Sequence, residues 1–259
     1  MRPGTIILLA LSAILVVAVF FIDPIPQDLS YHEFADTRPL LGIANFWNVV
    51  SNIPFLLVGG AGLGYLRTKN RPGILPDLYT AYLVFFAGIC LTGFGSAYYH
   101  YAPGNDTLIW DRLPMTLGFM GFTTIIIGEH ISLPAARRML IPLLFVGAAS
   151  VVYWAITETR GSGDLRPYAI VQFLPMFLIP AILLLYRSIF NSVIFFWFMI
   201  VLYALSKLFE FFDFPVYDIG ELISGHSLKH FVAAMAPLVL LYGLDSRRPR
   251  AEAGIVERI

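Results

Sequence analysis

Two histidines near the C-terminus have a spacing that suits a metal site. His226 and His230 are four residues apart, so on a helix their imidazoles project from one face on successive turns. A third nitrogen from another helix would complete a three-histidine set with one position open for water. The chain has a single cysteine, and imidazole ligands without thiolates favour zinc, although iron and manganese are also compatible with them.

The composition indicates what kind of scaffold must hold these residues. Of the 259 residues, 58% are hydrophobic and 13% are charged, whereas a soluble domain has about 25% charged residues. The formal net charge is zero, which indicates no polyanionic partner such as nucleic acid. These values exclude a disordered chain and an ordinary cytosolic enzyme, and they predict a polytopic membrane protein.

Apolar runs define the path of the chain through the membrane. About 18 apolar residues are enough to cross a bilayer as a helix, and no run alternates with the period of two that a barrel strand requires. We predict an all-α membrane protein with eight spans, at residues 5–22, 45–66, 78–100, 108–128, 138–156, 167–186, 189–209 and 225–243. The first run resembles a secretory signal, but no small-residue cleavage pattern follows it, so we favour an uncleaved helix over the seven-span alternative.

Basic residues set the orientation. If the N-terminus is inside, the segments on the cytoplasmic side carry eleven Lys and Arg residues, from Arg2 to Arg258, and the opposite loops carry three: Arg38, Arg160 and Arg166. Cytoplasmic loops are the basic ones. We therefore predict that both termini are cytoplasmic, which agrees with an even number of spans.

This topology brings five polar residues to one depth near the outer leaflet. Ser96 and His100 end the third span, Asp111 opens the fourth, and His226 and His230 open the eighth. A charged side chain in a membrane helix costs about 2.5–3.5 kcal/mol on insertion scales, so its presence requires a reason. We expect His100, His226 and His230 to bind one metal ion. His32, in the first outer loop, and His130, near the inner face, are less suitable.

Ordinary interpretations exist for the other polar positions. Ser96 alone could bond to its own helix, and Asp111 alone could complement a helix dipole. Two interpretations fit Lys207, Glu210 and Asp213. We favour a solvated helix end; the alternative is a role at the entrance of the site, together with Lys229. The remaining expectations are hydrogen bonds between helices for Asn48 and Asn52, and simple packing for Cys90.

Four segments together resemble the alkaline ceramidase family, within the wider CREST group of membrane hydrolases. They are Asn45-Phe-Trp-Asn-Val-Val-Ser-Asn52, Gly95-Ser-Ala-Tyr-Tyr-His100, Asp111-Arg-Leu-Pro-Met115 and His226-Ser-Leu-Lys-His230. The family has a seven-helix core, so the resemblance implies an added N-terminal helix and outer loop at 1–41, a metal-hydrolase domain at 42–244 and a cytoplasmic tail at 245–259.

The resemblance also implies roles. His100, His226 and His230 would be the ligands of one catalytic zinc ion, Ser96 would polarise the substrate carbonyl, and Asp111 would be the acid and base. Eukaryotic members also have a calcium site that ends in a Glu before Phe-Trp-Asn. Asn45 occupies that position here, and Asp28, Glu33 and Asp36 do not follow the family arrangement, so we do not include calcium in the predicted site.

The implied activity is hydrolysis of the amide bond of ceramide or a similar N-acyl lipid at the extracytoplasmic leaflet, with no protein partner implied. Two other functions are compatible with the same residues. One is a non-enzymatic receptor with a structural zinc, because fold does not settle function; the other is hydrolysis of an ester lipid. A transporter is less consistent with the sequence, because the polar residues lie at one depth and do not follow a path across the bilayer.

Overall fold

The computed structural model describes residues 3–191 and 193–250, and in these residues the regular structure is helical, with isolated β-bridges at Leu40–Ile43 and Phe190–Pro249. The last residues of the predicted tail, from 251 onward, lie outside the described residues. The α-helices are α1 (Pro3–Val19), α2 (Phe46–Val50), α3 (Ile53–Leu66), α4 (Tyr79–Tyr101), α5 (Asn105–His130), α6 (Leu133–Thr159), α7 (Arg166–Leu185), α8 (Ile194–Phe211), α9 (Asp213–Asp218) and α10 (Gly225–Ser246). Short 3-10 turns, η1 (Leu29–His32) and η2 (Pro76–Leu78), precede α2 and α4.

Six segments of the described chain are long and apolar enough to cross a membrane, as an integral membrane protein requires. They are Phe46–Leu66, Pro76–Tyr101, Leu133–Thr159, Arg166–Leu185, Ile194–Phe211 and Gly225–Ser246. They correspond to six of the eight predicted spans. The other two predicted spans correspond to α1, which is a shorter apolar helix, and to α5, which is 26 residues long and includes Asp106, Asp111, Arg112 and Glu129. Their crossing of the membrane stays a prediction.

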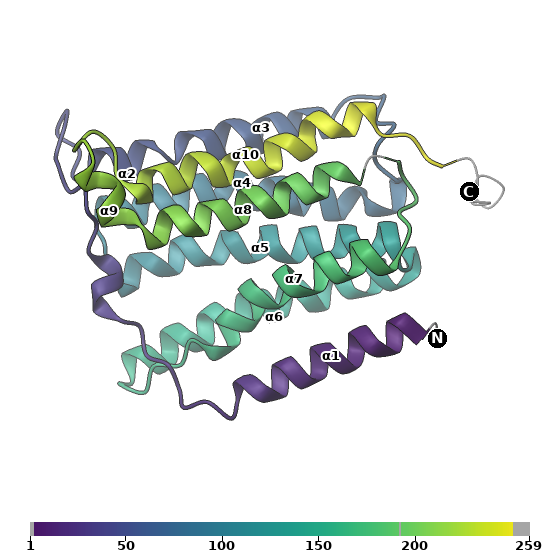
Figure 1. The fold of residues 1–259 in the computed structure, drawn as a ribbon, viewed down its shortest axis with the longest axis horizontal. Helices are drawn as coiled ribbons and strands as arrows, with labels where there is room; N and C mark the ends of the chain where they lie inside the picture. Colours follow the sequence, from purple (N-terminus) through teal and green to yellow (C-terminus); the bar gives the residue numbers. More distant parts are fainter. Residues whose placement is uncertain (1–2, 192, 251–259) are drawn as a thin grey trace.

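The long helices lie side by side in one elongated bundle, with α1 at its edge (Figure 1). The short helices α2 and α9 lie at one end of the bundle. The described part of α1 begins at the other end, where α10 also ends. On α1, Oγ1 of Thr5 lies 2.8 Å from the hydroxyl of Tyr186, just beyond α7, so the added helix is joined to the bundle by a polar contact as well as by packing.

The predicted span at 45–66 is divided into two helices. The break lies at Ser51 and Asn52, between α2 and α3. The Asn52 side chain donates to the carbonyl of Asn48 at 2.8 Å, a local bond that competes with the helical ladder, and Pro54 cannot donate a backbone hydrogen bond of its own. The break turns Ser51 toward the interior, where it is fully buried.

A buried ion pair closes the end of the bundle opposite α2 and α9. Arg247, just after α10, pairs with Glu129 of α5 and donates to the Tyr82 hydroxyl of α4 at 3.0 Å. All three side chains are almost completely buried. The first residues of the predicted tail therefore pack into the bundle, because a buried guanidinium must have partners.

Candidate metal centre and active site

The three predicted histidines converge at the end of the bundle that carries α2 and α9. His100 comes from the last turn of α4, and His226 and His230 come from the first two turns of α10. Their ring centroids are 4.7–5.0 Å apart, and each offers a ring nitrogen within 4.8 Å of the others. At most 5% of each residue is exposed. Three buried histidines at this spacing could hold a metal ion.

The geometry of two of these nitrogens fits zinc. Nε2 of His100 and Nε2 of His226 are 3.3 Å apart, and two nitrogens bound to a tetrahedral zinc at about 2.0–2.1 Å are about 3.3 Å from each other. Nδ1 of His100 is buried and has no hydrogen-bond partner among the described residues. A set of three imidazoles is also the donor set that catalytic zinc sites use. The residues present therefore fit the ion.

Ser51 orients the third imidazole. Its Oγ lies 2.7 Å from Nδ1 of His230 and donates to the carbonyl of Asn48 at 3.2 Å. Because the single hydroxyl proton is directed to that carbonyl, Nδ1 of His230 is the donor in the other bond. This fixes the tautomer and leaves Nε2 of His230 free for a ligand, as outer partners of metal-bound histidines commonly do.

The start of α10 is set by three contacts around His226. Ser224 caps the helix by accepting from the amide of Ser227 at 3.1 Å, which is a preferred arrangement at a helix N-terminus. A Cβ on Gly225 would lie 2.4 Å from the carbonyl oxygen of Phe209, so only glycine allows this close approach. The buried Asp213 accepts from the amide of His226 at 2.7 Å and from the amide of Ala35 at 2.9 Å, and thereby joins α10 to the outer loop.

Two residues from the outer segment hold His100. The Phe34 ring packs against two of the imidazoles, with its centroid 4.7 Å from that of His100 and 4.6 Å from that of His226. The amide of Asn45 donates to the carbonyl of His100 at 2.9 Å. Asn45 thereby fastens the end of α4 to the outer segment.

Ser96 on α4 and Asp111 on α5 are the other two residues of the predicted site. A close approach of α4 and α5 brings them together, because a Cβ on Gly95 would lie 1.9 Å from the carbonyl of Trp110. The Ser96 hydroxyl is within hydrogen-bonding reach of the Asp111 carboxylate. Both side chains line the same cavity as His230. A hydroxyl and a carboxylate are thus available next to the candidate metal centre.

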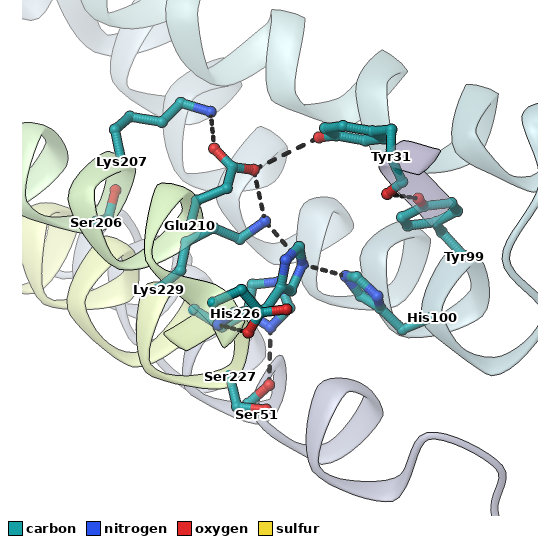
Figure 2. A network of polar contacts seen from close by, with 12 residues as sticks. Tyr31, Ser51, Tyr99, His100, Ser206, Lys207, Glu210, His226, Ser227 and Lys229 are labelled. Atoms are coloured by element: carbon teal, nitrogen blue, oxygen red, sulfur yellow. Dashed lines mark hydrogen bonds and ion pairs between the residues drawn. The ribbon is translucent and has the colours of Figure 1, made fainter. Parts of the chain in front are cut away.

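A series of linked ion pairs lies next to this site (Figure 2). Glu210 is paired with Lys207 and with Lys229, the latter at 3.0 Å, and Lys229 also donates to Nε2 of His226 at 2.9 Å. The favoured interpretation of Lys207, Glu210 and Asp213 as a solvated helix end was therefore wrong. These side chains are buried or half-buried. Glu210 is linked to His226 through Lys229, and Asp213 accepts from the backbone amide of His226 because α9 folds back against α10.

The cavity next to the site has a volume of about 500 Å³, within the range of small-molecule pockets in proteins. Ser96, Asp111, Lys229 and Glu210 contribute polar groups to it. The larger part of its wall is apolar, with side chains from α3, α4, α5, α7, α8 and α10 that include Phe55, Phe85, Phe122, Met176, Ile179 and Met199. A cavity with one polar region and an apolar wall suits an amphipathic molecule.

The structure places the other singled-out residues outside the histidine group. His32 bonds to the Tyr99 hydroxyl and to Asn105, both at 2.9 Å, and His130 bonds to its own helix. Asn48 contacts α10 through Ser227 at 2.8 Å, as expected, but the Asn52 amide donates only within its own segment. Cys90 packs against α3, near the carbonyl of Leu56.

The loop segment that contains Asp28, Glu33 and Asp36 forms no second metal-binding group among the described residues. Both carboxylate oxygens of Asp36 accept from Arg38, at 2.8 and 2.7 Å.

The sequence matches the model of the ceramidase family over residues 40–243. The chain belongs to the ceramidase family. The matched region includes all three histidines, Ser96 and Asp111, and it begins after α1, as the resemblance implied. A comparison with curated proteins gave no match. Membership in this family implies a hydrolase that acts on a lipid.

The sequence did not predict the contacts of Ser51 and Phe34 with the histidines, or the place of Arg112 in the lining of the cavity. Ser51 shares a segment with Asn48 and Asn52, so a polar residue facing the same interior could have been recognised there. Phe34 carries no such signal, because the loop that places it has no periodicity. Arg112 carries no distinguishing signal either, because nothing in the sequence shows that its side chain is buried.

Proposed function

We propose that this protein is a zinc-dependent hydrolase that cleaves the amide bond of ceramide or a similar N-acyl lipid. The products are a fatty acid and a long-chain amine. The observation that carries the proposal is the convergence of His100, His226 and His230 beside Ser96 and Asp111, at the polar region of an otherwise apolar cavity.

His100, His226 and His230 would hold the ion, and a zinc ion in such a site supplies a Lewis acid and lowers the pKa of its water to about 7. Asp111 would take the proton of the attacking water on a carboxylate oxygen. It then delivers a proton to the nitrogen of the leaving amine, as a general base and acid does. The oxygen of water becomes part of the fatty acid, and its proton ends on the amine.

Ser96 would act on the carbonyl oxygen of the substrate. Its hydroxyl is buried, lines the cavity and lies one turn before His100 on α4. A donor aimed at the oxygen that gains charge contributes about 2.7–4 kcal/mol in other enzymes. The apolar wall excludes water and accommodates the acyl chain, which supports a lipid as the substrate.

The metal content of the protein tests the proposed binding of one zinc ion by the three histidines. Purified protein should contain about one zinc per chain, and His230→Ala should lose most of it. His130→Ala is the matched control, because His130 is buried but lies away from the three ligands. Full retention of zinc by His230→Ala, or iron or manganese in place of zinc, would refute the assignment of the ion.

Turnover of lipid substrates tests the proposed hydrolysis of an amide bond. Purified protein should release fatty acid from N-acyl lipids, and a chelator should stop the release. Asp111→Asn should keep the metal and lose at least about a hundredfold in turnover, the lower range for a general acid–base. An ester lipid with the same acyl chain belongs in the panel. Zinc binding without turnover of any lipid would favour a structural role for the ion.

The same proposal includes the topology. We infer eight spans with both termini in the cytoplasm and the active site near the extracytoplasmic leaflet. The excess of basic residues in the predicted inner loops supports this orientation, as does the position of the start of α1 and the end of α10 at one end of the bundle (Figure 1). A C-terminal reporter should read cytoplasmic; an external signal would refute the model.

A further inference from the structure

Arg112 is a buried cation without an acidic partner. It lies one residue after Asp111 on α5, lines the same cavity and is 6% exposed. Its Nη2 donates to Oε1 of Gln27 at 2.7 Å, while Nη1 is buried and has no hydrogen-bond partner among the described residues. A buried N–H of a charged group is costly when it has no acceptor. Nη1 of Arg112 therefore needs an acceptor that the described residues do not supply.

Aromatic rings hold the guanidinium in place. Its central carbon lies 4.3 Å from the ring centroid of Trp154, 4.8 Å from that of Tyr168 and 5.8 Å from that of Tyr31. Such contacts stabilise a cation, but they offer no acceptor in the plane of its N–H groups. The in-plane positions are where carboxylates and phosphates bind arginine.

The acidic groups around Arg112 are engaged elsewhere. Glu158 accepts from the amide of Gln27 and from Nε1 of Trp154, both at 3.1 Å, and so orders two partners of Arg112 without contacting the guanidinium. Glu210 is paired with Lys207 and Lys229. Asp111 interacts with Lys229 and Ser96 as well as with its neighbour Arg112, but it forms no ion pair with the guanidinium among the described residues. No ion pair joins Arg112 to any carboxylate in the described part of the chain.

A series of contacts links Arg112 to the candidate metal centre. Tyr31, whose ring lies beside the guanidinium, has its hydroxyl 3.5 Å from Oε1 of Glu210, and Glu210 pairs with Lys229, which contacts His226. Arg112 therefore belongs to the polar region of the cavity, which also contains the candidate metal centre. A group bound there would belong to the part of a lipid near its amide bond.

We propose that Arg112 binds an acidic group, carboxylate or phosphate, on the amine part of the substrate. The preferred substrate is then an N-acyl lipid with an anionic head, in contrast to neutral ceramide. This inference rests on the proposed function for the location of the amide, but the anion site itself depends only on Arg112 and its surroundings. Gln27 holds the guanidinium without neutralising it and so leaves the charge for the ligand.

Turnover by zinc-loaded, full-length protein in neutral lipid nanodiscs gives the first test. The substrates are N-palmitoylglycine, which has a carboxylate, ceramide 1-phosphate, which has a phosphate, and ceramide, which has neither. Wild-type protein should have a higher kcat/KM for at least one acidic substrate than for ceramide. Arg112→Gln should raise KM for that substrate about tenfold or more, as expected for loss of a charge-assisted hydrogen bond, and should raise KM for ceramide much less.

Two further variants separate charge recognition from folding. Gln27→Glu keeps Arg112 but gives it an internal carboxylate, and it should reduce the preference for acidic substrates in the same direction as Arg112→Gln. Arg137→Gln is the matched control, because it removes a charge from an exposed ion pair with Asp77, outside the lining of this cavity. It should change neither KM. An unchanged ratio of acidic to neutral turnover in both Arg112→Gln and Gln27→Glu overturns the inference.

A binding measurement distinguishes failure of this inference from failure of the proposed function. Hexadecyl phosphate, which has no amide bond, should displace a fluorescent acyl probe from wild-type protein at a concentration at least about tenfold lower than from Arg112→Gln. Equal affinity for the two proteins overturns the anion site, whether or not any lipid is hydrolysed. Tighter binding to the wild type together with no amide hydrolysis supports the anion site and refutes the hydrolase.

Discussion

Nδ1 of His230 and Oγ of Ser51 are 2.7 Å apart, and the Ser51 hydroxyl donates onward to the carbonyl of Asn48. The first contact joins a candidate metal ligand on α10 to the break between α2 and α3. Both residues are buried, so water cannot replace the bond. The orientation of the third imidazole therefore depends on a residue 179 positions away in the sequence.

Ser51→Ala should weaken zinc binding about 10- to 100-fold, the usual cost of losing a partner of a metal-bound histidine. Without the hydroxyl, the Nδ1 proton of His230 has no acceptor and the other tautomer becomes accessible. Competition with a chromogenic chelator measures the affinity. Ser150→Ala is the control, because Ser150 is also buried but bonds only to its own helix, α6. An equal effect of both substitutions would refute the role of Ser51.

Asp213→Ala should loosen the start of α10. The substitution leaves the buried amide of His226 and the partly buried amide of Ala35 without their acceptor, and an unsatisfied buried group costs about 1–3 kcal/mol. We expect a lower thermal unfolding temperature and faster loss of zinc to a chelator. Asp218→Asn, at an exposed acid of the same short helix, should behave as the wild type. Unchanged zinc release in Asp213→Ala would contradict the expected link between this carboxylate and the metal centre.

Glu210→Gln should lower zinc affinity about tenfold. Glu210 neutralises and positions Lys229, whose ammonium donates to the same Nε2 of His226 that a metal ion would need. Without the carboxylate, the ammonium is held at His226 more firmly and repels an incoming dication. Lys229→Met in the Glu210→Gln background should restore the affinity. If the double variant binds zinc as weakly as Glu210→Gln alone, competition by Lys229 is not the cause.

The ion pair of Asp164 and Arg166 should make stability depend on pH. In the loop before α7, two hydrogen bonds of 2.8 Å from the Arg166 guanidinium lower the pKa of the Asp164 carboxyl, against the opposing effect of burial. A carboxyl whose pKa is lowered on folding stabilises the protein above its unfolded pKa of about 3.9. That contribution is lost as the pH falls through the lower folded value.

Asp164→Asn tests this dependence. It should lower the unfolding temperature by a few degrees at pH 7, since hydrogen bonds to charged groups contribute about 1.5–3 kcal/mol. The difference from wild type should shrink as the pH falls below about 4. Arg166 also donates to the carbonyl of Ile22, near the segment that carries Gln27, so the variant should also disturb the surroundings of Arg112. A constant difference between pH 7 and pH 3 would contradict the assignment.

The sequence by itself determined the membrane class, six of the spans and the three histidines. Apolar length is a local property, because each spanning helix satisfies its own backbone bonds within one segment. The depth of a residue then follows from its position along its span, so His100, His226 and His230 could be placed at one level without coordinates. The polar cost of such residues in a membrane helix made them stand out.

Only the tertiary structure decided which side chains surround the histidines. Ser51 contacts His230 because the helix breaks after α2, Asp213 reaches His226 because α9 folds back, and Arg112 turns into an aromatic pocket closed by a loop after α1. These contacts depend on rotation about each helix axis and on irregular loops. Neither is encoded in apolar length or depth, because packing between whole elements sets them.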